Sequence, residues 1–337
     1  MAYKIIITRQ PLCDAGMAAL AGKADCAIID KLHAYEFLTE LQKVDGLMIK
    51  EGIIGREEME ACPNLKVIAR HGVGYETVDV KAAAELGIPV VYTPGANARS
   101  VAEHTLALIL ALTKNLVESH NETLRGNWNI RRAFRSYEFE GRLVGMVGLG
   151  RIGGEVARLC QAVGFRVCAY DPFIPADRIR EMGYSACESL EELLRVSDVV
   201  SVHVHYNEST RNMIAEKELT LMKPDAILIN VSRGGIVNEA DLARALETDR
   251  LGGAGLDVFV GEVLQPDSPL TKAPRIICTP HMAAQTNKAV EQICDMMVAG
   301  TLAILDGKKW PYVADRSVYE HPRWKDRPWA DGKGENL

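Results

Sequence analysis

Long apolar runs, closely spaced cysteines and an excess of basic residues are all missing from this 337-residue sequence. No stretch approaches the roughly eighteen uninterrupted apolar residues that a membrane-spanning helix needs. Residues 1–10 have an apolar core too short for a signal peptide, so we expect them to form a first strand. The formal net charge is −6 and most basic residues are dispersed. We therefore expect neither a membrane nor a nucleic acid among the partners.

The eight cysteines never fall within three residues of one another, which excludes CxxC redox motifs and zinc ribbons. Most of them lie in apolar runs, where buried thiols behave as small hydrophobic residues. We expect a reducing, cytoplasmic location and no metal site. The apolar fraction of 47% and the charged fraction of 25% are ordinary globular values, and the length suits two domains.

Short β-rich runs alternate with helical patterns along almost the whole chain. This alternation predicts right-handed βαβ units, and therefore an α/β fold with two doubly wound parallel sheets. Several runs are apolar on both faces, as strands buried between helices require. The expected strands form two series, the first at 3–8, 46–50, 65–70 and 89–93, and the second at 143–148, 166–170, 199–204, 226–231, 253–258 and 275–279.

Two long helices punctuate these series and set the expected domain boundaries. One begins at Ser100, which has the spacing of a capping box with Glu103, and the other covers about 286–305. Helices in these places can carry the chain out of one domain and back. The pattern predicts a discontinuous domain with a dinucleotide-binding domain inserted into it, at residues 1–99 plus 285–337 and at residues 100–284 respectively.

The segment 310–337 has no periodicity but holds three of the four tryptophans. It could be disordered, or it could lie across a partner or across its own domain. The tryptophans favour packing, because disordered tails tend to lack aromatic residues.

A GxGxxG pattern directly follows an expected strand and opens a helical pattern. Gly148 would allow the tight turn, Gly150 would let the backbone approach a pyrophosphate, and Gly153 would let the helix pack against the strand. Arg151 and Ile152 open that helix, whose N-terminal amides would face the phosphates. The context predicts a dinucleotide-binding turn.

Asp171 ends the next strand, about 20 residues after the turn. A carboxylate at this place bonds the hydroxyls of the adenosine ribose and repels a 2′-phosphate. We therefore expect NAD, and not NADP, as the cofactor.

Three further polar residues follow expected strand ends, where open α/β sheets bind their ligands. Arg233 comes after 226–231, and Glu262 and His281 come after the next two strands. A guanidinium can hold a carboxylate and polarise the adjacent carbonyl. An imidazole can exchange the hydroxyl proton, and a carboxylate beside it would fix its tautomer. The three residues suit hydride transfer between a nicotinamide cofactor and a 2-hydroxy acid.

With these motifs together, the chain resembles the D-isomer-specific 2-hydroxyacid dehydrogenases, which include D-3-phosphoglycerate dehydrogenases and hydroxypyruvate reductases. The matching stretches fall in order within roughly residues 3–306 and read ARHGVGYETVDV (69–80), ANARSVAEHTLAL (96–108), LVGMVGLGRIGGEVA (143–157), INVSRGGIVNEADL (229–242), GLDVFVGE (255–262) and TPHMAAQT (279–286). The resemblance implies a flavodoxin-like substrate domain, a Rossmann cofactor domain and a homodimer. It implies a catalytic role for Arg233, Glu262 and His281.

The resemblance also implies binding roles for residues that no pattern would single out. The backbone amides of Val73 and Gly74 would bind the substrate carboxylate, and Asp257 would bond the nicotinamide carboxamide. The remaining positions of the cofactor wall would be His203, Val231 and Ser232.

Several positions depart from the family pattern and leave the substrate open. Val263 stands where the family usually has proline, His205 stands where it commonly has proline, and Ala283-Ala284 replace Gly-Ala. Lys50 follows a strand at a place where phosphoglycerate dehydrogenases often carry a cation for the phosphate.

A small basic cluster precedes the first strand of the cofactor domain. We hypothesise that Lys50 with Arg131 or Arg132, near Arg135, selects a second anionic group; a solvated basic face explains the cluster equally well.

Two other functions are compatible with the sequence. C-terminal-binding-protein corepressors of this family bind NAD as sensing scaffolds, and they can retain the Arg233, Glu262 and His281 set. Formate oxidation fits less well, because that branch uses glutamine where this chain has Glu262.

Overall fold

The computed structural model describes residues 2–8, 12–29, 42–50, 52–133 and 136–330. The chain divides into two compact units, and each has its own parallel sheet. The first unit combines both ends of the chain, Met1–Asn97 with Thr286–Leu337, and the second is Ala98–Gln285. Among the residues that the structure describes, none of the helices is both long and apolar enough to span a membrane.

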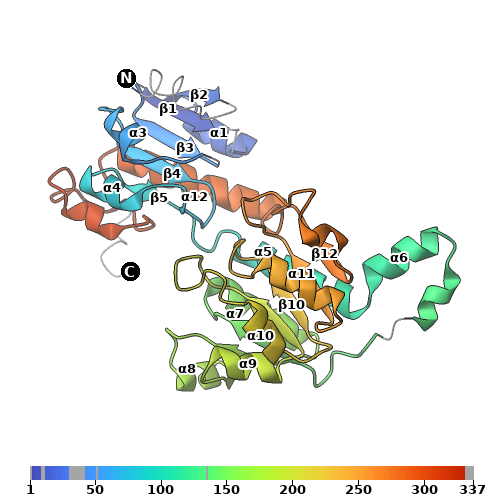
Figure 1. Ribbon diagram of the computed structural model, residues 1–337. Coiled ribbons are helices and arrows are strands. Elements are labelled where there is room, and N and C mark those ends of the chain that lie inside the picture. The colour runs from blue at the N-terminus through green and yellow to red at the C-terminus, as the bar shows by residue number, and fades with distance from the viewer. Residues whose placement is uncertain (1, 9–11, 30–41, 51, 134–135, 331–337) are drawn as a thin grey trace. The chain divides into compact units, whose positions relative to one another are not determined.

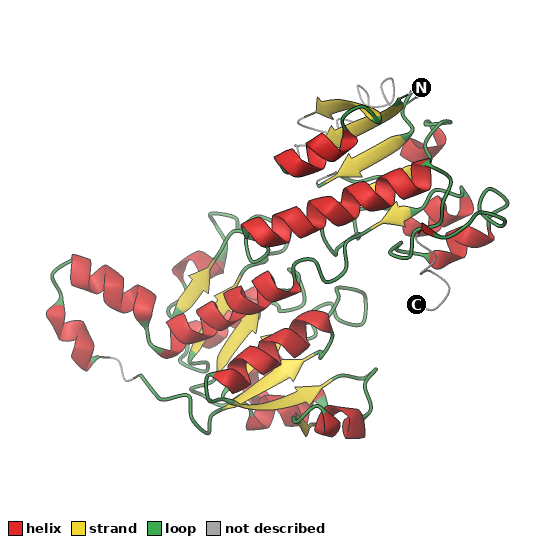
Figure 2. Cartoon of the chain, turned by 180° about the vertical axis from the view of Figure 1, so that it is seen from behind, coloured by secondary structure: helices red, strands yellow, loops and turns green. Residues whose placement is uncertain are grey.

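The first unit is a five-stranded sheet of order β2-β1-β3-β4-β5, in which every neighbouring pair is parallel. This order is the flavodoxin-like one. Helices pack on this sheet, and α12 packs along β3, β4 and β5 (Figures 1 and 2). Its elements are β1 (Tyr3–Thr8), α1 (Asp14–Leu20), β2 (Ala24–Ile29), β3 (Gly46–Ile49), α3 (Arg56–Glu60), β4 (Val67–Arg70), α4 (Val80–Glu85), β5 (Val90–Val91), α12 (Asn287–Leu305) and η3 (Arg316–Glu320).

The second unit is a seven-stranded parallel sheet of order β12-β11-β10-β9-β6-β7-β8, the doubly wound order of dinucleotide-binding domains with an added strand. Its central strands are buried apart from half-buried Leu143, as their largely apolar sequences require. Its strands are β6 (Leu143–Val147), β7 (Arg166–Tyr170), β8 (Ser185–Ala186), β9 (Val199–Val202), β10 (Ile227–Asn230), β11 (Gly253–Leu256) and β12 (Ile276–Cys278).

Helices cover this second sheet, and α5 contacts α7, β10, β11 and β12. The helices are α5 (Ala98–Thr113), α6 (Leu116–Leu124), η1 (Trp128–Arg132), α7 (Arg151–Ala162), α8 (Ala176–Glu181), α9 (Leu190–Val196), α10 (Glu216–Leu221), α11 (Glu239–Glu247) and η2 (Pro269–Lys272). The predicted α/β fold with two parallel sheets is confirmed.

One expected helix start is wrong. The helix begins at Ala98, so Ser100 lies inside its first turn and does not cap it. The Ser100 hydroxyl donates to the carbonyl oxygen of Ala283 at 2.7 Å, and Glu103 pairs with Arg99. Local spacing suggested a capping box, but a partner 183 residues away takes the hydroxyl. The second long helix starts where predicted, with the Thr286 hydroxyl accepting from the Ala289 amide.

The tryptophan-bearing segment packs on its own unit in the part that the structure describes, residues 310–330. Val313 pairs with Val91 beside β5, and Trp324 is buried in the first core. The rings of Tyr319 and Trp329 meet edge to face with centroids 5.3 Å apart. The tryptophans therefore mark packing, as their composition indicated.

Candidate functional site

The glycine turn between β6 and α7 has the geometry of a dinucleotide site. Gly148 has φ of 90°, and a Cβ there would lie 2.7 Å from the carbonyl oxygen of His203. A Cβ on Gly153 would collide with the Gly148 carbonyl, so helix and strand pack closer than a side chain allows. Beside Gly150 a Cβ would meet nothing within 4 Å, which leaves the open approach that a pyrophosphate needs. These residues fit the cofactor that the sequence predicts.

Asp171 lies directly beside this turn. One carboxylate oxygen accepts from the Leu149 amide at 2.9 Å and the other from the Phe173 amide at 2.9 Å. These bonds hold the carboxylate at the carboxyl end of β7. Each oxygen keeps acceptor capacity for a ribose hydroxyl. At the start of α7, Arg151 is exposed and Ile152 is half-buried.

His203, Val231 and Ser232 follow the carboxyl ends of β9 and β10, which are adjacent strands. The His203 Nε2 lies 2.8 Å from the Ser201 hydroxyl, and burial lowers the pKa of His203 to about 3. Val231 is buried, and the Ser232 hydroxyl donates to the side-chain oxygen of Asn230 at 2.7 Å. At neutral pH these three residues therefore form an uncharged surface at the carboxyl ends of β9 and β10.

His281 and Glu262 form a hydrogen-bonded pair, with His281 Nδ1 lying 2.7 Å from Glu262 Oε2. Both residues adopt left-handed backbone conformations, with φ of 49° and 69°. Such conformations are costly for residues other than glycine and cluster at functional sites. A carboxylate on Nδ1 leaves the Nε2 lone pair of a neutral imidazole available as a base.

Arg233 lies on the neighbouring loop after β10, half-buried, and its guanidinium donates to the Ser232 carbonyl at 2.7 Å. The next residue, Gly234, packs so tightly on Phe259 that a Cβ there would overlap the Phe259 backbone. The missing side chain brings the Arg233 loop against the loop that leads to Glu262. Sequence spacing did not identify Gly234, because the contact depends on tertiary packing.

Asp257 is fully buried and holds the turn that carries His281. Its carboxylate accepts from the amides of Met282 and Ala283, each at 2.9 Å, and from the Thr279 hydroxyl at 2.6 Å. The Thr279 hydroxyl in turn faces His104 from α5 at 3.0 Å. His104 and Thr279 were not predicted, and their only signal was membership of the stretches 96–108 and 279–286.

Lys50, Val73 and Gly74 lie in the first unit, after the carboxyl ends of the adjacent strands β3 and β4. Arg70 ends β4, and its guanidinium bonds the Lys50 carbonyl. Among the described residues, neither the Val73 nor the Gly74 amide donates a hydrogen bond, so both can serve a ligand. The carboxyl ends of β3 and β4 are therefore followed by basic side chains, and the amides of Val73 and Gly74 are two hydrogen-bond donors there.

His71, between Arg70 and this turn, is a further residue that no sequence pattern singled out. Burial, together with the charges of Lys50 and Arg70, lowers the pKa of His71 to about 4. Its imidazole is therefore neutral at physiological pH.

Arg131 and Arg132 are exposed at the end of η1. Arg135 lies outside the described residues. No group of three metal-ligating side chains gathers within the part of the chain that the structure describes.

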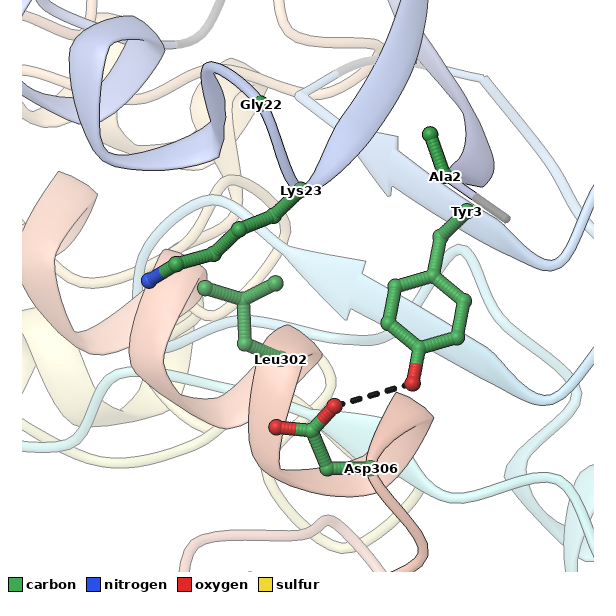
Figure 3. Close-up of a pocket in the computed structure, with 6 residues that line it drawn as sticks. All are labelled: Ala2, Tyr3, Gly22, Lys23, Leu302 and Asp306. Carbon is green, nitrogen blue, oxygen red and sulfur yellow. Dashed lines mark hydrogen bonds between the residues drawn. The ribbon is translucent and has the colours of Figure 1, made fainter.

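A hollow of about 400 Å³ opens at the amino end of β1 in the first unit (Figure 3). The Tyr3 hydroxyl donates to Asp306 at 2.9 Å, and this bond, with burial and nearby carboxylates, raises the pKa of Tyr3. Lys23 extends away from the pair (Figure 3). Because Lys50 and the 73–74 turn follow the carboxyl ends of the same sheet, this hollow is separate from them.

Acid is expected to destabilise the protein through two half-buried histidines whose pKa is lowered in the folded chain. The pKa of His71 is lowered to about 4 and that of His203 to about 3, whereas an unfolded histidine titrates near 6.5. Below pH 6.5 the unfolded chain therefore binds protons that the folded chain does not. The free energy of unfolding should fall by about 1.4 kcal/mol per pH unit for each histidine between about pH 6 and pH 4.

Urea unfolding at constant ionic strength measures this slope. The variant His203→Gln should lose one histidine's share of the slope, whereas His120→Gln, at an exposed position, should keep all of it. Equal slopes in wild type and His203→Gln would contradict the prediction.

Comparison with known proteins supplies the family. Residues 106–283 match the model described as D-isomer specific 2-hydroxyacid dehydrogenase, NAD binding domain. This match confirms NAD as the cofactor, and the matched residues lie within the second unit.

Among curated relatives, a D-3-phosphoglycerate dehydrogenase of Archaeoglobus fulgidus is 38% identical over 75% of this chain and 48% of the relative. The chain thus spans about half the length of that relative. An (S)-sulfolactate dehydrogenase of Chromohalobacter salexigens is 41% identical over 71% of this chain and 77% of the relative.

Among solved structures, a D-lactate dehydrogenase from Aquifex aeolicus in complex with NAD and lactic acid aligns with a TM-score of 0.79 and 30% identity. The alignment covers 90% of this chain and 96% of that one. The sequence and structural similarities agree, and the chain belongs to the D-isomer specific 2-hydroxyacid dehydrogenase family.

Proposed function

We propose that the protein is an NAD-dependent oxidoreductase that interconverts a D-2-hydroxy acid and its 2-keto acid. The observation that carries the proposal is the His281–Glu262 pair at 2.7 Å, at the same sheet edge as the glycine turn of the NAD-binding unit. The favoured substrate is of the phosphoglycerate or hydroxypyruvate type.

Each side chain has its own role in the proposed reaction. NAD, when bound, supplies the hydride acceptor. His281 takes the hydroxyl proton on Nε2 during oxidation and returns it during reduction. Glu262 holds Nδ1–H, keeps Nε2 as the basic atom and stabilises the imidazolium. Arg233 binds the substrate carboxylate and polarises the reacting carbonyl, which a planar guanidinium does with two parallel donors.

The cofactor contacts belong to the same proposal. Gly148, Gly150 and Gly153, with the amides at Arg151 and Ile152, would hold the pyrophosphate. Asp171 would bond the adenosine ribose. The nicotinamide end would lie against the surface already described, formed by His203, Val231 and Ser232, with Asp257 beneath it.

On the substrate side, the amides of Val73 and Gly74 would bind the carboxylate. Lys50 would bind a second anionic group, with Arg131 or Arg132 contributing. The basic side chains of Lys50 and Arg70 support this selectivity, because a buried or half-buried cation favours an anionic ligand. Two relatives are named for a phosphorylated and a sulfonated acid, which have that second charge.

A panel of keto acids with NADH tests the function and the selectivity together. Hydroxypyruvate, phosphohydroxypyruvate, sulfopyruvate, glyoxylate and pyruvate would be compared by NADH oxidation. Lys50→Ala is expected to lower kcat/KM for the charged acids by about tenfold to a hundredfold, and for pyruvate far less, since one charge-assisted bond is lost.

Lys81→Ala, at an exposed position on α4, is the matched control. Equal losses for charged and uncharged acids would remove the selectivity from the proposal. Tight NADH binding with no turnover of any acid would instead favour a nucleotide-sensing scaffold.

Exchange of the cofactor preference tests the role of Asp171. Asp171→Ala removes the ribose acceptor and the charge that repels a 2′-phosphate. The ratio of kcat/KM for NAD over NADP should fall by about a hundredfold. Asp177→Ala, on the exposed face of α8, should leave the ratio unchanged. If wild type already uses NADP as well as NAD, Asp171 does not discriminate.

The proposal includes a homodimer in a reducing, cytoplasmic compartment. None of the eight cysteines, all of which lie in the described part of the chain, forms a disulfide, which supports the compartment. Apolar side chains lie exposed on α6 and η1, where Leu116 is 56%, Leu124 75% and Trp128 70% exposed. A second copy would cover such a patch. Sedimentation equilibrium of wild type and Leu124→Glu tests this: a monomeric wild type would refute the dimer.

A further inference from the structure

The backbone of the turn that carries His281 is held by one buried carboxylate. The His281 amide donates to the Asp257 carbonyl at 2.8 Å, while the next two amides donate to the two carboxylate oxygens at 2.9 Å each. His281 needs such restraint, because its φ of 49° is unfavourable for a residue with a Cβ. The position of the imidazole therefore depends on the position of Asp257.

His104, on α5, reaches this carboxylate through a hydroxyl. The Thr279 hydroxyl donates to Asp257 Oδ1 at 2.6 Å, so its oxygen is left to accept from His104 Nε2–H at 3.0 Å. His104 Nε2 itself lies 3.6 Å from Oδ1. The bonds form a chain from α5 through Thr279 and Asp257 to the His281 turn.

The burial of Asp257 makes this series of hydrogen bonds important for stability. Asp257 is 0% exposed, and a buried carboxylate is costly unless hydrogen-bond donors surround it. In the described part of the chain, His104 is the basic side chain that faces the Asp257 carboxylate. Removing its donor leaves the Thr279 oxygen unsatisfied and frees the hydroxyl to turn toward another acceptor; the Leu256 carbonyl already lies 3.5 Å away.

We propose that His104 is a positioning residue. It acts through Thr279 and Asp257 to keep the His281 imidazole in place for its hydrogen bond with Glu262. This rests on the proposed function, in which His281 exchanges the proton. His104 contacts neither His281 nor Glu262, and its effect should appear more in turnover and in the order of the turn than in NADH binding, to which Asp257 is one of several contributors.

Two pairs of variants test the chain of bonds. His104→Leu and Thr279→Val remove the donor and the hydroxyl at similar volume. His104→Gln and Thr279→Ser keep an N–H and a hydroxyl in similar places. The first pair should lower kcat by about tenfold, with KM for NADH changed less than about twofold, and the second pair should recover most of the loss. Thr271→Val, exposed on η2, is the matched control.

Amide hydrogen exchange in the protein without cofactor gives a readout that does not depend on activity. Exchange at Met282 and Ala283 should be about tenfold faster in His104→Leu and Thr279→Val, and near wild type in His104→Gln. If His104→Leu does not fold, Thr279→Val carries the test alone.

The outcomes separate this proposal from the proposed function. Unchanged exchange in Thr279→Val, or equal losses in His104→Leu and His104→Gln, would overturn the positioning role. A wild type without turnover would refute the dehydrogenase activity instead, and the exchange data would then decide whether His104 holds the turn.

Discussion

Replacing His281 with alanine is expected to lower kcat/KM for the 2-keto acid by about a thousandfold to ten-thousandfold. General acid–base catalysis by a positioned side chain contributes on this scale, and no other group in the proposed mechanism exchanges the proton. NADH binding should persist, because the glycine turn and Asp171 are unaffected. Stopped-flow NADH oxidation with titration of NADH fluorescence measures both.

Glu262→Gln serves as the graded comparison for this prediction. It keeps a hydrogen-bonding group near Nδ1 but removes the charge that stabilises the imidazolium, so its loss should be smaller than that of His281→Ala. His120→Ala, on the exposed face of α6, is the control. Turnover by His281→Ala within tenfold of wild type would show that another group transfers the proton.

Arg233→Lys is expected to lower kcat/KM by about a hundredfold or more, with both kcat and KM affected. Lysine keeps the charge but loses the two parallel donors that match a carboxylate. Binding of the substrate carboxylate weakens, and the reacting carbonyl is less polarised. Steady-state kinetics with the best acid of the panel separates the two effects.

Chemical rescue sharpens the Arg233 prediction. Added guanidinium should restore part of the activity of Arg233→Ala but none of that of His281→Ala. Arg178→Lys, exposed on α8 and paired with Glu181, is the matched control. Full activity in Arg233→Lys would mean that a point charge at this position is sufficient, which would contradict a bidentate role.

Most of the architecture could be predicted because its signals are short-range. Strand and helix patterns repeat over a few residues, and the glycines at 148, 150 and 153 meet steric needs of one turn. Strand ends place Arg233, Glu262 and His281 at one edge as soon as β10, β11 and β12 are known to be neighbours. The helix start at Ser100 failed for the opposite reason, since the partner of its hydroxyl is remote in sequence.

The sequence by itself thus determined two parallel α/β units, a glycine turn between a strand and a helix, and three polar residues at strand ends. Only the tertiary structure decided that Glu262 and His281 meet at 2.7 Å and that Asp257 holds the turn beneath them. The reason is the separation along the sequence between the residues that interact. Periodicity and turn residues follow from neighbouring backbone, whereas the network from His104 to Asp257 joins α5 to a strand end more than a hundred residues away. The spacing of residues in the sequence does not show which distant polar groups form hydrogen bonds with one another. The folded structure decides these partners, because polar groups that become buried together must be hydrogen-bonded.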